Sequence, residues 1–267
     1  MGTPLSLKDI DVVILCGGLG KRLQGVVADR PKPMAEINQR PFLDILIEYV
    51  AGYGFNRFIL CIGYMGEVIR GHYQKSRRPS TILFSEEKEP LGTAGAIKNA
   101  EPLIQSSPFL VMNGDSFCQV ELDRFIDFHI TKGTLVTMVL AWAGETADYG
   151  SVTINSSGQI LRFDEKVYRG GRRLINAGVY LMEEEVLSLI PPHRNYSLEY
   201  HLFPMIIDRK VYGYVTEGGL IDIGTPQRYA KARDFIYEKG GLSAYSTDAF
   251  WNNGDHPEIQ GLGQRDT

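Results

Sequence analysis

An apolar run that ends at a pair of glycines constrains this chain more than any other stretch. The run covers residues 12–16, and a turn rich in glycine follows it directly. A short apolar run bounded by glycine is typical of a buried β-strand. The glycines of the turn are Gly17, Gly18 and Gly20. Because glycine has no Cβ, these residues would let backbone N–H groups approach a ligand closely.

Basic side chains follow the same turn: Lys21, Arg22 and Lys32. Cations beside the N–H groups of a glycine turn are suited to a polyphosphate. Arg22 could hold a phosphate through two hydrogen bonds, whereas Lys32 would act as a point charge. Pro31 and Pro33 fix the backbone on both sides of Lys32. A tight turn with solvated cations is the competing interpretation.

Two common phosphate-binding motifs do not fit this turn. A Walker A loop has the pattern GxxxxGK[ST], but Gly20-Lys21 is followed by Arg22, and Leu15 stands where the first glycine belongs. The dinucleotide motif GxGxxG also fails, because Leu23 replaces its third glycine. An oxidoreductase of the Rossmann type is therefore disfavoured, and we expect no NAD(P) binding.

Strand-like and helix-like segments alternate through the first half of the chain. Apolar runs predict strands, and apolar residues at helical spacing predict helices. The expected strands are 12–16, 57–62, 81–84, 109–112 and 135–141, and the expected helices are 42–53 (ended by Gly54), 67–73, 93–100 and 122–131. Repeated β-α-β units predict an α/β fold whose sheet is parallel or mostly parallel, with helices on both faces.

The second half of the chain changes character. Residues 151–154 and 160–163 flank a turn and predict a hairpin. Further strands are expected at 174–182, 211–215 and 220–223, and helices at 183–190, 200–208 and 226–238. Residues 1–240 are expected to form one domain. Residues 241–267 lack periodicity and are rich in Gly, Ser, Asn, Asp and Gln, so a mobile or surface-docked tail is expected.

Composition narrows the class of protein. A net charge of −4 over 267 residues predicts no nucleic-acid partner. No apolar run reaches transmembrane length and the N-terminus lacks a signal-peptide core, so no membrane partner is expected. The cysteines are Cys16, Cys61 and Cys118, without a CxxC pair; buried free thiols in a cytoplasmic protein are expected. The oligomeric state stays open, a homo-oligomer included.

Two aspartates follow predicted strands. Asp115 comes after residues 109–112 through Asn113-Gly114, and Asp222 comes after Leu220-Ile221. Ligands of open α/β sheets bind at the carboxyl ends of the strands. A carboxylate near phosphates suits Mg²⁺, which prefers one or two carboxylates plus phosphate oxygens. For Asp115, an aspartate that caps a turn is the alternative.

An acidic run precedes a glycine-rich helix start, which contains Gly92, Thr93 and Gly95. The carboxylate of Glu87 could accept the N1–H and N2–H₂ groups of guanine, whereas uracil O4 and adenine N1 would oppose it with further acceptors. A solvated acidic loop is the alternative.

Glu165-Lys166 follows another predicted strand. An acceptor beside a cation suits a sugar hydroxyl plus a phosphate. A surface salt bridge is the alternative.

Together these motifs resemble the sugar-1-phosphate nucleotidyltransferases over roughly residues 10–238. The family signature GGxGTRL…PKP is similar to residues 17–23 followed by Pro31-Lys32-Pro33. The remaining similar segments are Gly114-Asp115, Glu165-Lys166, Asn176-Ala177-Gly178-Val179-Tyr180 and the late Asp222. Lys21 departs from the pattern, because the family usually has threonine there. A hydroxyl contact to phosphate is then lost or replaced by a cation.

The resemblance implies a Rossmann-like, GT-A-like, three-layer α/β/α fold with a mostly parallel mixed sheet. It implies that an NTP and a sugar 1-phosphate give an NDP-sugar and pyrophosphate, without a protein nucleophile. Catalytic roles are implied for Arg22, Lys32 and Asp115, with Mg²⁺ on Asp115 and Asp222. Nucleotide contacts are implied at Leu15, Gly17, Gly18, Gly20, Lys21, Arg22, Glu87, Gly92, Thr93, Gly95 and Asn113. Sugar-phosphate contacts are implied at Gly150, Glu165, Lys166 and Asn176.

Within the family, residues 87–95 resemble the guanylyltransferases, which use GTP. The compact chain is most similar to the D-glycero-α-D-manno-heptose 1-phosphate guanylyltransferases, which serve cell-surface polysaccharide synthesis. Alternatives are a mannose-1-phosphate guanylyltransferase, which is usually longer, and a uridylyl- or thymidylyltransferase for another hexose 1-phosphate. A non-catalytic nucleotide-sugar sensor on the same fold is an alternative of a different class.

Overall fold

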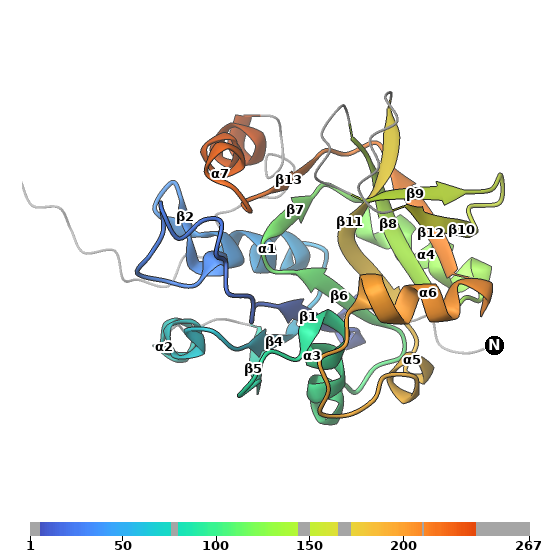
Figure 1. The fold of residues 1–267 in the computed structure, drawn as a ribbon, viewed down its shortest axis with the longest axis horizontal. Coiled ribbons are helices and arrows are strands. Elements are labelled where there is room, and N and C mark those ends of the chain that lie inside the picture. The colour runs from blue at the N-terminus through green and yellow to red at the C-terminus, as the bar shows by residue number, and fades with distance from the viewer. Residues whose placement is uncertain (1–5, 76–79, 144–149, 165–171, 210, 239–267) are drawn as a thin grey trace, which may run out of the picture.

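The computed structural model describes residues 6–75, 80–143, 150–164, 172–209 and 211–238. A central sheet runs through them, with helices on both of its faces (Figure 1). Its strands are β1 (Asp11–Leu15), β4 (Arg57–Ile62), β5 (Thr81–Glu86), β6 (Phe109–Asn113), β8 (Val136–Ala143), β9 (Ser151–Ile154), β10 (Ile160–Asp164), β11 (Arg173–Met182) and β12 (Val211–Thr216).

The sheet is mixed and mostly parallel. Strands β5, β4, β1 and β6 lie side by side in that order and are parallel. Strand β11 lies antiparallel to β6, and β8 lies antiparallel to β11, with β12 parallel to β8 at the edge. The hairpin of β9 and β10 joins β11. Every strand of this sheet except β10 and β11 therefore points the same way, as predicted.

Helices on the two faces bury different side chains of the same strands. In β1, Val12 and Ile14 join one hydrophobic core and Val13 joins the other, because successive side chains of a strand point to opposite faces. The first core packs under α1 (Phe42–Ala51), α2 (Gly66–Lys75), α4 (Leu122–Lys132) and α7 (Pro226–Arg233). The second packs under α3 (Gly92–Ala100), α5 (Glu185–Ser188) and α6 (Phe203–Ile206). The predicted three-layer α/β/α arrangement is confirmed.

Short elements complete the fold. Two small antiparallel ribbons lie outside the central sheet: β2 (Glu36–Ile37) with β3 (Arg40–Pro41), and β7 (Ser116–Cys118) with β13 (Leu220–Asp222). The 3-10 helices are η1 (Leu7–Asp9), η2 (Lys32–Met34), η3 (Glu101–Leu103) and η5 (Ile207–Arg209), and the π turns are η4 (Leu198–Leu202) and η6 (Asp234–Glu238). None of the described helices is long and apolar enough to cross a membrane.

Several predicted elements differ from the observed ones at their ends. Helix α1 ends at Ala51, and Gly54 lies in the following turn with a φ of 104°. The helix expected at 200–208 is broken into η4, α6 and η5, because Pro204 has no N–H to continue a helix across its position. Strand β7 was not predicted. All three cysteines are buried and unpaired, as predicted, while residues 241–267 lie outside the described part of the chain.

Candidate active site

A cavity of about 490 Å³ opens at the carboxyl ends of β1 and β6. Leu15 and Asn113, the last residues of these strands, lie in its wall. Because parallel strands end at one edge of the sheet, loops far apart in the sequence share one hollow there. Most of the predicted nucleotide and catalytic residues line it: Leu15, Gly17, Gly18, Gly20, Lys21, Arg22, Lys32, Glu87, Gly92, Thr93, Asn113 and Asp115.

The end of β6 comes close to β1 because residue 114 is glycine. The Gly114 N–H donates to the Leu15 carbonyl at 2.9 Å. A Cβ on Gly114 would lie 2.7 Å from that carbonyl oxygen and 3.0 Å from Cys16 Sγ. A larger residue would separate the two strand ends. Gly114 therefore allows the two strand ends to pack closely, and the next residue, Asp115, lines the cavity.

Lys32 and Asp115 form an ion pair at the cavity wall. Lys32 Nζ lies 2.5 Å from Asp115 Oδ2, and the two side chains are 12% and 37% exposed. The second oxygen, Asp115 Oδ1, accepts a hydrogen bond from the Ser116 hydroxyl at 3.1 Å. A largely buried ammonium group depends on its counter-charge. Asp115 thus supplies the counter-charge of Lys32 and fixes its position.

Arg22, Lys32 and Asp222 converge on Gly224. A Cβ on Gly224 would lie 2.6 Å from Asp222 Oδ1, 3.2 Å from Lys32 Nζ and 3.7 Å from Arg22 Nη2. Arg22 is otherwise exposed to solvent. The cations of the first loop and the late aspartate therefore meet at one end of the cavity, where phosphates of a nucleotide would find both positive charge and a carboxylate.

The ribbon of β7 and β13 brings Asp222 beside Asp115. Ser116 and Asp222 are partners in its register, and the Ile223 N–H donates to the Asp115 carbonyl at 3.0 Å. The Asp222 side chain is held by the Gly224 N–H at 2.7 Å on Oδ1, and by Arg228 at 2.7 Å on Oδ2. Asp115 therefore pairs with Lys32 and Asp222 pairs with Arg228 close by, and only Asp115 of these two carboxylates lines the cavity.

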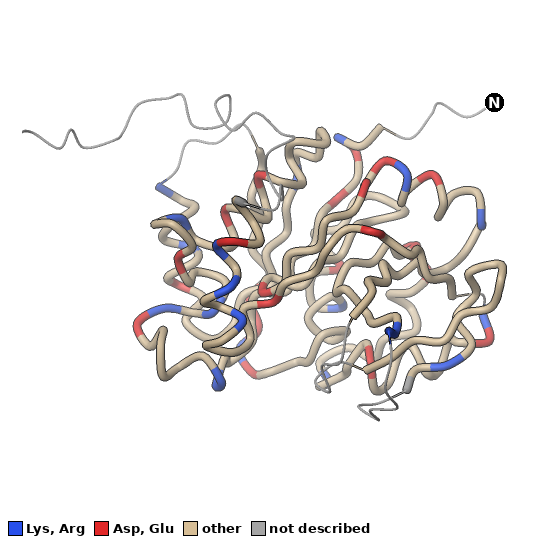
Figure 2. Tube along the Cα trace, turned by 90° about the horizontal axis from the view of Figure 1, so that it is seen from above, with Lys and Arg blue, Asp and Glu red and all other residues tan. Residues whose placement is uncertain are grey.

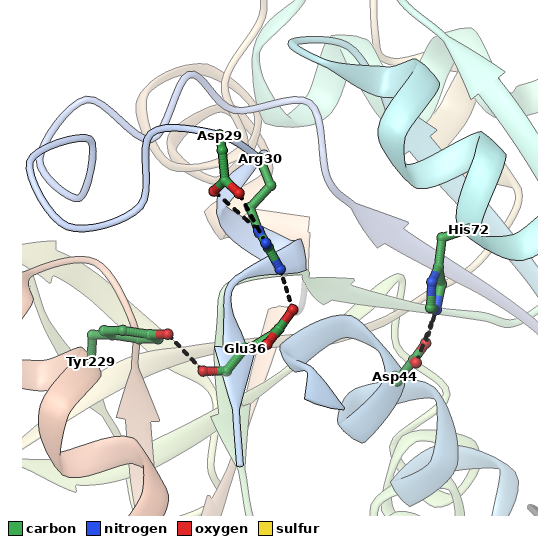
Figure 3. A network of polar contacts seen from close by, with 6 residues as sticks. All are labelled: Asp29, Arg30, Glu36, Asp44, His72 and Tyr229. Atoms are coloured by element: carbon green, nitrogen blue, oxygen red, sulfur yellow. Dashed lines mark hydrogen bonds and ion pairs between the residues drawn. The ribbon is translucent and has the colours of Figure 1, made fainter. Parts of the chain in front are cut away.

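Helix α7 supports the loop that carries Lys32 (Figure 3). The Tyr229 hydroxyl donates to the Glu36 carbonyl at 2.6 Å, and the Glu36 carboxylate forms an ion pair with Arg30. Arg30 and Glu36 flank Lys32 in the sequence. The residue before Tyr229 in the same helix, Arg228, holds the late aspartate. Helix α7 therefore contacts both the loop of Lys32 and the side chain of Asp222.

Glu87 packs against glycines at another part of the wall. Its carboxylate occupies the space that a Cβ on Gly17 would need, and a Cβ on Gly63 would lie 2.7 Å from Oε1. Oε2 accepts the Leu91 N–H at 3.1 Å. Burial raises the pKa of Glu87, and the hydrogen bond from Leu91 opposes that rise in part. Glu87 lines the cavity, and its predicted role as an acceptor for the base stays a prediction.

A family model described as "Nucleotidyl transferase" matches residues 11–239. The chain belongs to the nucleotidyl transferase family. A D-glycero-alpha-D-manno-heptose 1-phosphate guanylyltransferase of Campylobacter jejuni is 33% identical over 220 residues, which are 82% of this chain and 97% of that enzyme. One from Aneurinibacillus thermoaerophilus is 34% identical, over 84% of this chain and 97% of that enzyme.

Solved structures agree with this membership. The crystal structure of HddC from Yersinia pseudotuberculosis has a TM-score of 0.76 and 36% sequence identity, covering 84% of this chain and 98% of that one. A second structure of HddC was determined in complex with GMP-PN. A putative glucose-1-phosphate thymidylyltransferase from Bacillus anthracis, with a TM-score of 0.72 over 84% of this chain and 94% of that one, shares the fold at 17% identity.

In this nucleotidyl transferase, residues 194–196 support the loop at 90–95 from outside. The Tyr196 N–H donates to the Leu91 carbonyl at 2.8 Å, and the Gly95 N–H donates to the Tyr196 carbonyl at 3.0 Å. A Cβ on Gly95 would lie 2.5 Å from the Arg194 carbonyl oxygen. Gly95 therefore packs against backbone, and it does not line the cavity as the nucleotide prediction expected.

The Thr93 hydroxyl is also used within the protein. It donates to Glu199 Oε2 at 3.0 Å and accepts from the Leu198 N–H at 2.7 Å. Thr93 does line the cavity. Its hydroxyl already has two partners, so a contact with nucleotide would use the remaining lone pair or the methyl group.

The predicted sugar-phosphate residues are less well gathered. Asn176 lies at a bulge of β11, where Oδ1 accepts the Gly178 N–H at 2.9 Å and Nδ2 donates to the Tyr180 hydroxyl at 2.8 Å. Its amide shapes the strand and does not line the cavity. Gly150 is exposed. Glu165 and Lys166 lie outside the described residues.

Sequence reasoning missed several lining residues, namely Cys16, Leu19, Pro33, Pro90, Ala96, Asn195 and Gly224. Asn195 carried no signal, because its place beside Gly92 follows from tertiary packing. Cys16 follows the first strand directly, but burial raises its pKa far above the ordinary thiol range. A buried neutral thiol is a poor nucleophile, so Cys16 is assigned no catalytic role.

The described residues hold no cluster of three or more His, Cys, Asp or Glu side chains arranged for a metal ion. The donor set at the charged end is the pair Asp115 and Asp222. Two carboxylates beside the basic side chains of the first loop would fit Mg²⁺, which usually takes its remaining ligands from phosphate oxygens and water. Along the described chain, acidic and basic residues are interspersed in the view of Figure 2.

Proposed function

We propose that this nucleotidyl transferase transfers GMP from GTP to D-glycero-α-D-manno-heptose 1-phosphate, giving GDP-heptose and pyrophosphate. The full-length similarity to two heptose 1-phosphate guanylyltransferases supports the choice of substrates. The observation that carries the chemistry is the convergence of Arg22, Lys32 and Asp115 at one end of the cavity. The proposal also includes that residues 1–240 form one domain and that the protein is cytoplasmic.

In the proposed reaction, a phosphate oxygen of the sugar 1-phosphate attacks the α-phosphorus of GTP. The new bond joins that oxygen to the α-phosphorus, and the bond to the β-phosphate oxygen breaks and releases pyrophosphate. The attacking group is already an anion, so the protein needs only to position the phosphates and to stabilise charge. Arg22 would bind the triphosphate and the leaving pyrophosphate. Lys32, and Lys166 beyond the described residues, would hold phosphates that repel one another.

Asp115 and Asp222 would hold Mg²⁺, and the bound ion would supply charge stabilisation for phosphate oxygens. A phosphate oxygen would compete with Asp115 for Lys32, and a metal ion would compete with Lys32 for Asp115. Gly17, Gly18 and Gly20 would offer backbone N–H groups to the phosphates. The sugar would be oriented by Glu165 and Asn176, and by the backbone near Gly150.

The proposal is tested by a matrix of GTP, ATP, UTP and dTTP against heptose, mannose and glucose 1-phosphates, scored by pyrophosphate release with Mg²⁺. The highest kcat/KM is expected for GTP with the heptose substrate. Binding of nucleotide without turnover of any sugar would favour a non-catalytic sensor instead. A preference for mannose 1-phosphate would favour the second candidate, a mannose-1-phosphate guanylyltransferase.

That second candidate has a specific observation in its favour. A mannose-1-phosphate guanylyltransferase of Mycobacterium tuberculosis is 32% identical over 231 residues. These residues are 85% of this chain but only 64% of that enzyme. The heptose enzymes match almost end to end, and this difference in coverage is why the heptose substrate is preferred here.

A further inference from the structure

Asn195 lines the cavity, although it belongs to none of the motifs identified in the sequence. It lines the same hollow as Glu87, Gly92 and Thr93. Its Nδ2 donates a hydrogen bond to the Pro90 carbonyl at 2.8 Å, which settles the orientation of the amide. The other amide atom, Oδ1, is therefore an acceptor, and the described residues provide no donor to it.

Gly92 leaves that acceptor open to the cavity. A Cβ on Gly92 would lie 3.1 Å from Asn195 Oδ1, and Gly92 has a φ of 71°. A side chain at position 92 would therefore crowd the amide as well as strain the backbone. The Asn195 amide oxygen therefore lies beside Gly92, which belongs to the same loop as the Leu91 N–H that holds Glu87.

The backbone that follows Asn195 is held by hydrogen bonds to the loop at residues 91–95. Tyr196 exchanges hydrogen bonds with Leu91 and Gly95, and the Leu198 N–H binds the Thr93 hydroxyl. The amide of Asn195 is thus held at a defined place relative to the start of α3. An acceptor held in this way can discriminate between ligands that carry a donor and those that lack it.

We propose that Asn195 is a specificity-determining residue of the nucleotide site, and that its Oδ1 accepts a hydrogen bond from the nucleoside of GTP. The donor is either the 2-amino group of guanine or a ribose hydroxyl, since these groups of GTP carry N–H or O–H donors. The inference deepens the proposed function and rests on it. Glu87 and Asn195 would then contribute two acceptors to one nucleoside pocket.

The test is a cycle of nucleotide analogues against variants. The value of kcat/KM is measured for GTP, for ITP, which lacks the 2-amino group, and for 2′-deoxy- and 3′-deoxy-GTP. The enzymes are the wild type, Asn195→Leu, Asn195→Asp and the neighbouring control Arg194→Gln. Arg194 is exposed and its side chain is not part of the cavity wall, so this control should match the wild type.

The wild type should prefer GTP over one of the three analogues by roughly two- to tenfold, the worth of one neutral hydrogen bond. In Asn195→Leu the preference for GTP over that analogue should fall by the same factor, and the analogue concerned identifies the donor. Any part of the preference over ITP that comes from Glu87 should remain. Asn195→Asp keeps an acceptor and should retain the preference, although it loses the support of Pro90. Preferences that are equal in the wild type and Asn195→Leu would overturn the proposal, because a purely structural residue lowers all nucleotides alike.

Failure of the proposed function is distinguishable from failure of this inference. If the wild type releases no pyrophosphate with any sugar 1-phosphate, the proposed function fails, and binding of the same nucleotides is then measured by calorimetry without sugar. If turnover is normal and the analogue ratios do not respond to Asn195→Leu, the inference alone fails. A wild type that does not discriminate among the four nucleotides would also refute it.

Discussion

Replacing Asp115 by asparagine separates the catalytic charge from its structural role. The variant keeps the size of the side chain, and the contact with Lys32 would become a hydrogen bond from the ammonium group to a neutral amide. Lys32 is only 12% exposed, so the loss of its counter-charge should cost about 1–2 kcal/mol of folding free energy. For a domain of this size, that lowers Tm by roughly 2–8 °C.

The expected loss of activity is larger. In the proposed function Asp115 holds Mg²⁺, so its replacement would remove a metal ligand and weaken charge stabilisation at the reacting phosphates. This should lower kcat by about 10²–10³-fold, a factor taken from the loss of one oxyanion-stabilising group. That factor corresponds to roughly 2.7–4 kcal/mol, more than the predicted loss of stability. Because a domain stable by about 5–15 kcal/mol stays folded after the smaller loss, activity at 25 °C should report the reaction and not unfolding.

The assay is pyrophosphate release from GTP and the heptose 1-phosphate across a titration of Mg²⁺, together with thermal unfolding of each protein. The matched control is Asp29→Asn, which removes a carboxylate of the loop of Lys32 that is paired with Arg30 at the surface. The control should retain wild-type kcat and Mg²⁺ dependence. Activity of the Asp115 variant within about threefold of the control would refute the reasoning that places phosphate chemistry at this carboxylate.

Three further results are expected. Glu87→Gln should weaken the preference for GTP over UTP. Because burial raises the pKa of Glu87, the wild-type preference should fade on acidification at a higher pH than an ordinary glutamate would give, while the variant shows no such step; an unchanged nucleotide ranking would remove Glu87 from base recognition. Gly114→Ala should destabilise the fold by about 1–3 kcal/mol in denaturant titration, since its Cβ would lie 2.7 Å from the Leu15 carbonyl oxygen; wild-type stability would contradict the close approach. Burial lowers the pKa of His129 despite Glu183 nearby, so folding opposes its protonation. Stability should therefore fall as pH drops from the unfolded pKa of about 6.5 toward the lower folded value, and His129→Gln should reduce that slope.

The amount of structure that could be predicted from the sequence depended on how local its causes are. The strand at residues 12–16 and the glycine turn after it were predicted because apolar pattern and glycine act within a few residues. The cavity confirms that the loop of Arg22 and the end of β6 meet, since parallel strands end at one edge. The predicted roles of Lys32 and Asp115 in catalysis remain predictions, although the structure places the two side chains in contact.

Other features could not be predicted because they arise between distant segments. Strand β7 is three residues long and pairs with β13 about a hundred residues later, so no local pattern marks it. Asn195 reaches the cavity only because its neighbours pack on Gly92 and Gly95. The amide of Asn176 was predicted to contact sugar, but the bulge around Gly178 gives it internal partners, and a linear motif cannot distinguish these uses.

The contact of α7 with the loop of Lys32 has a consequence for how the enzyme is made. Tyr229 and Glu36 are 193 positions apart in the chain, and Arg228 beside Tyr229 steadies Asp222. During synthesis the ribosome therefore releases the loop of Lys32 long before α7. Contacts of such long range close late in folding. We therefore expect the charged end of the cavity to become ordered only after β12, the last strand of the central sheet, and α7 have both been made.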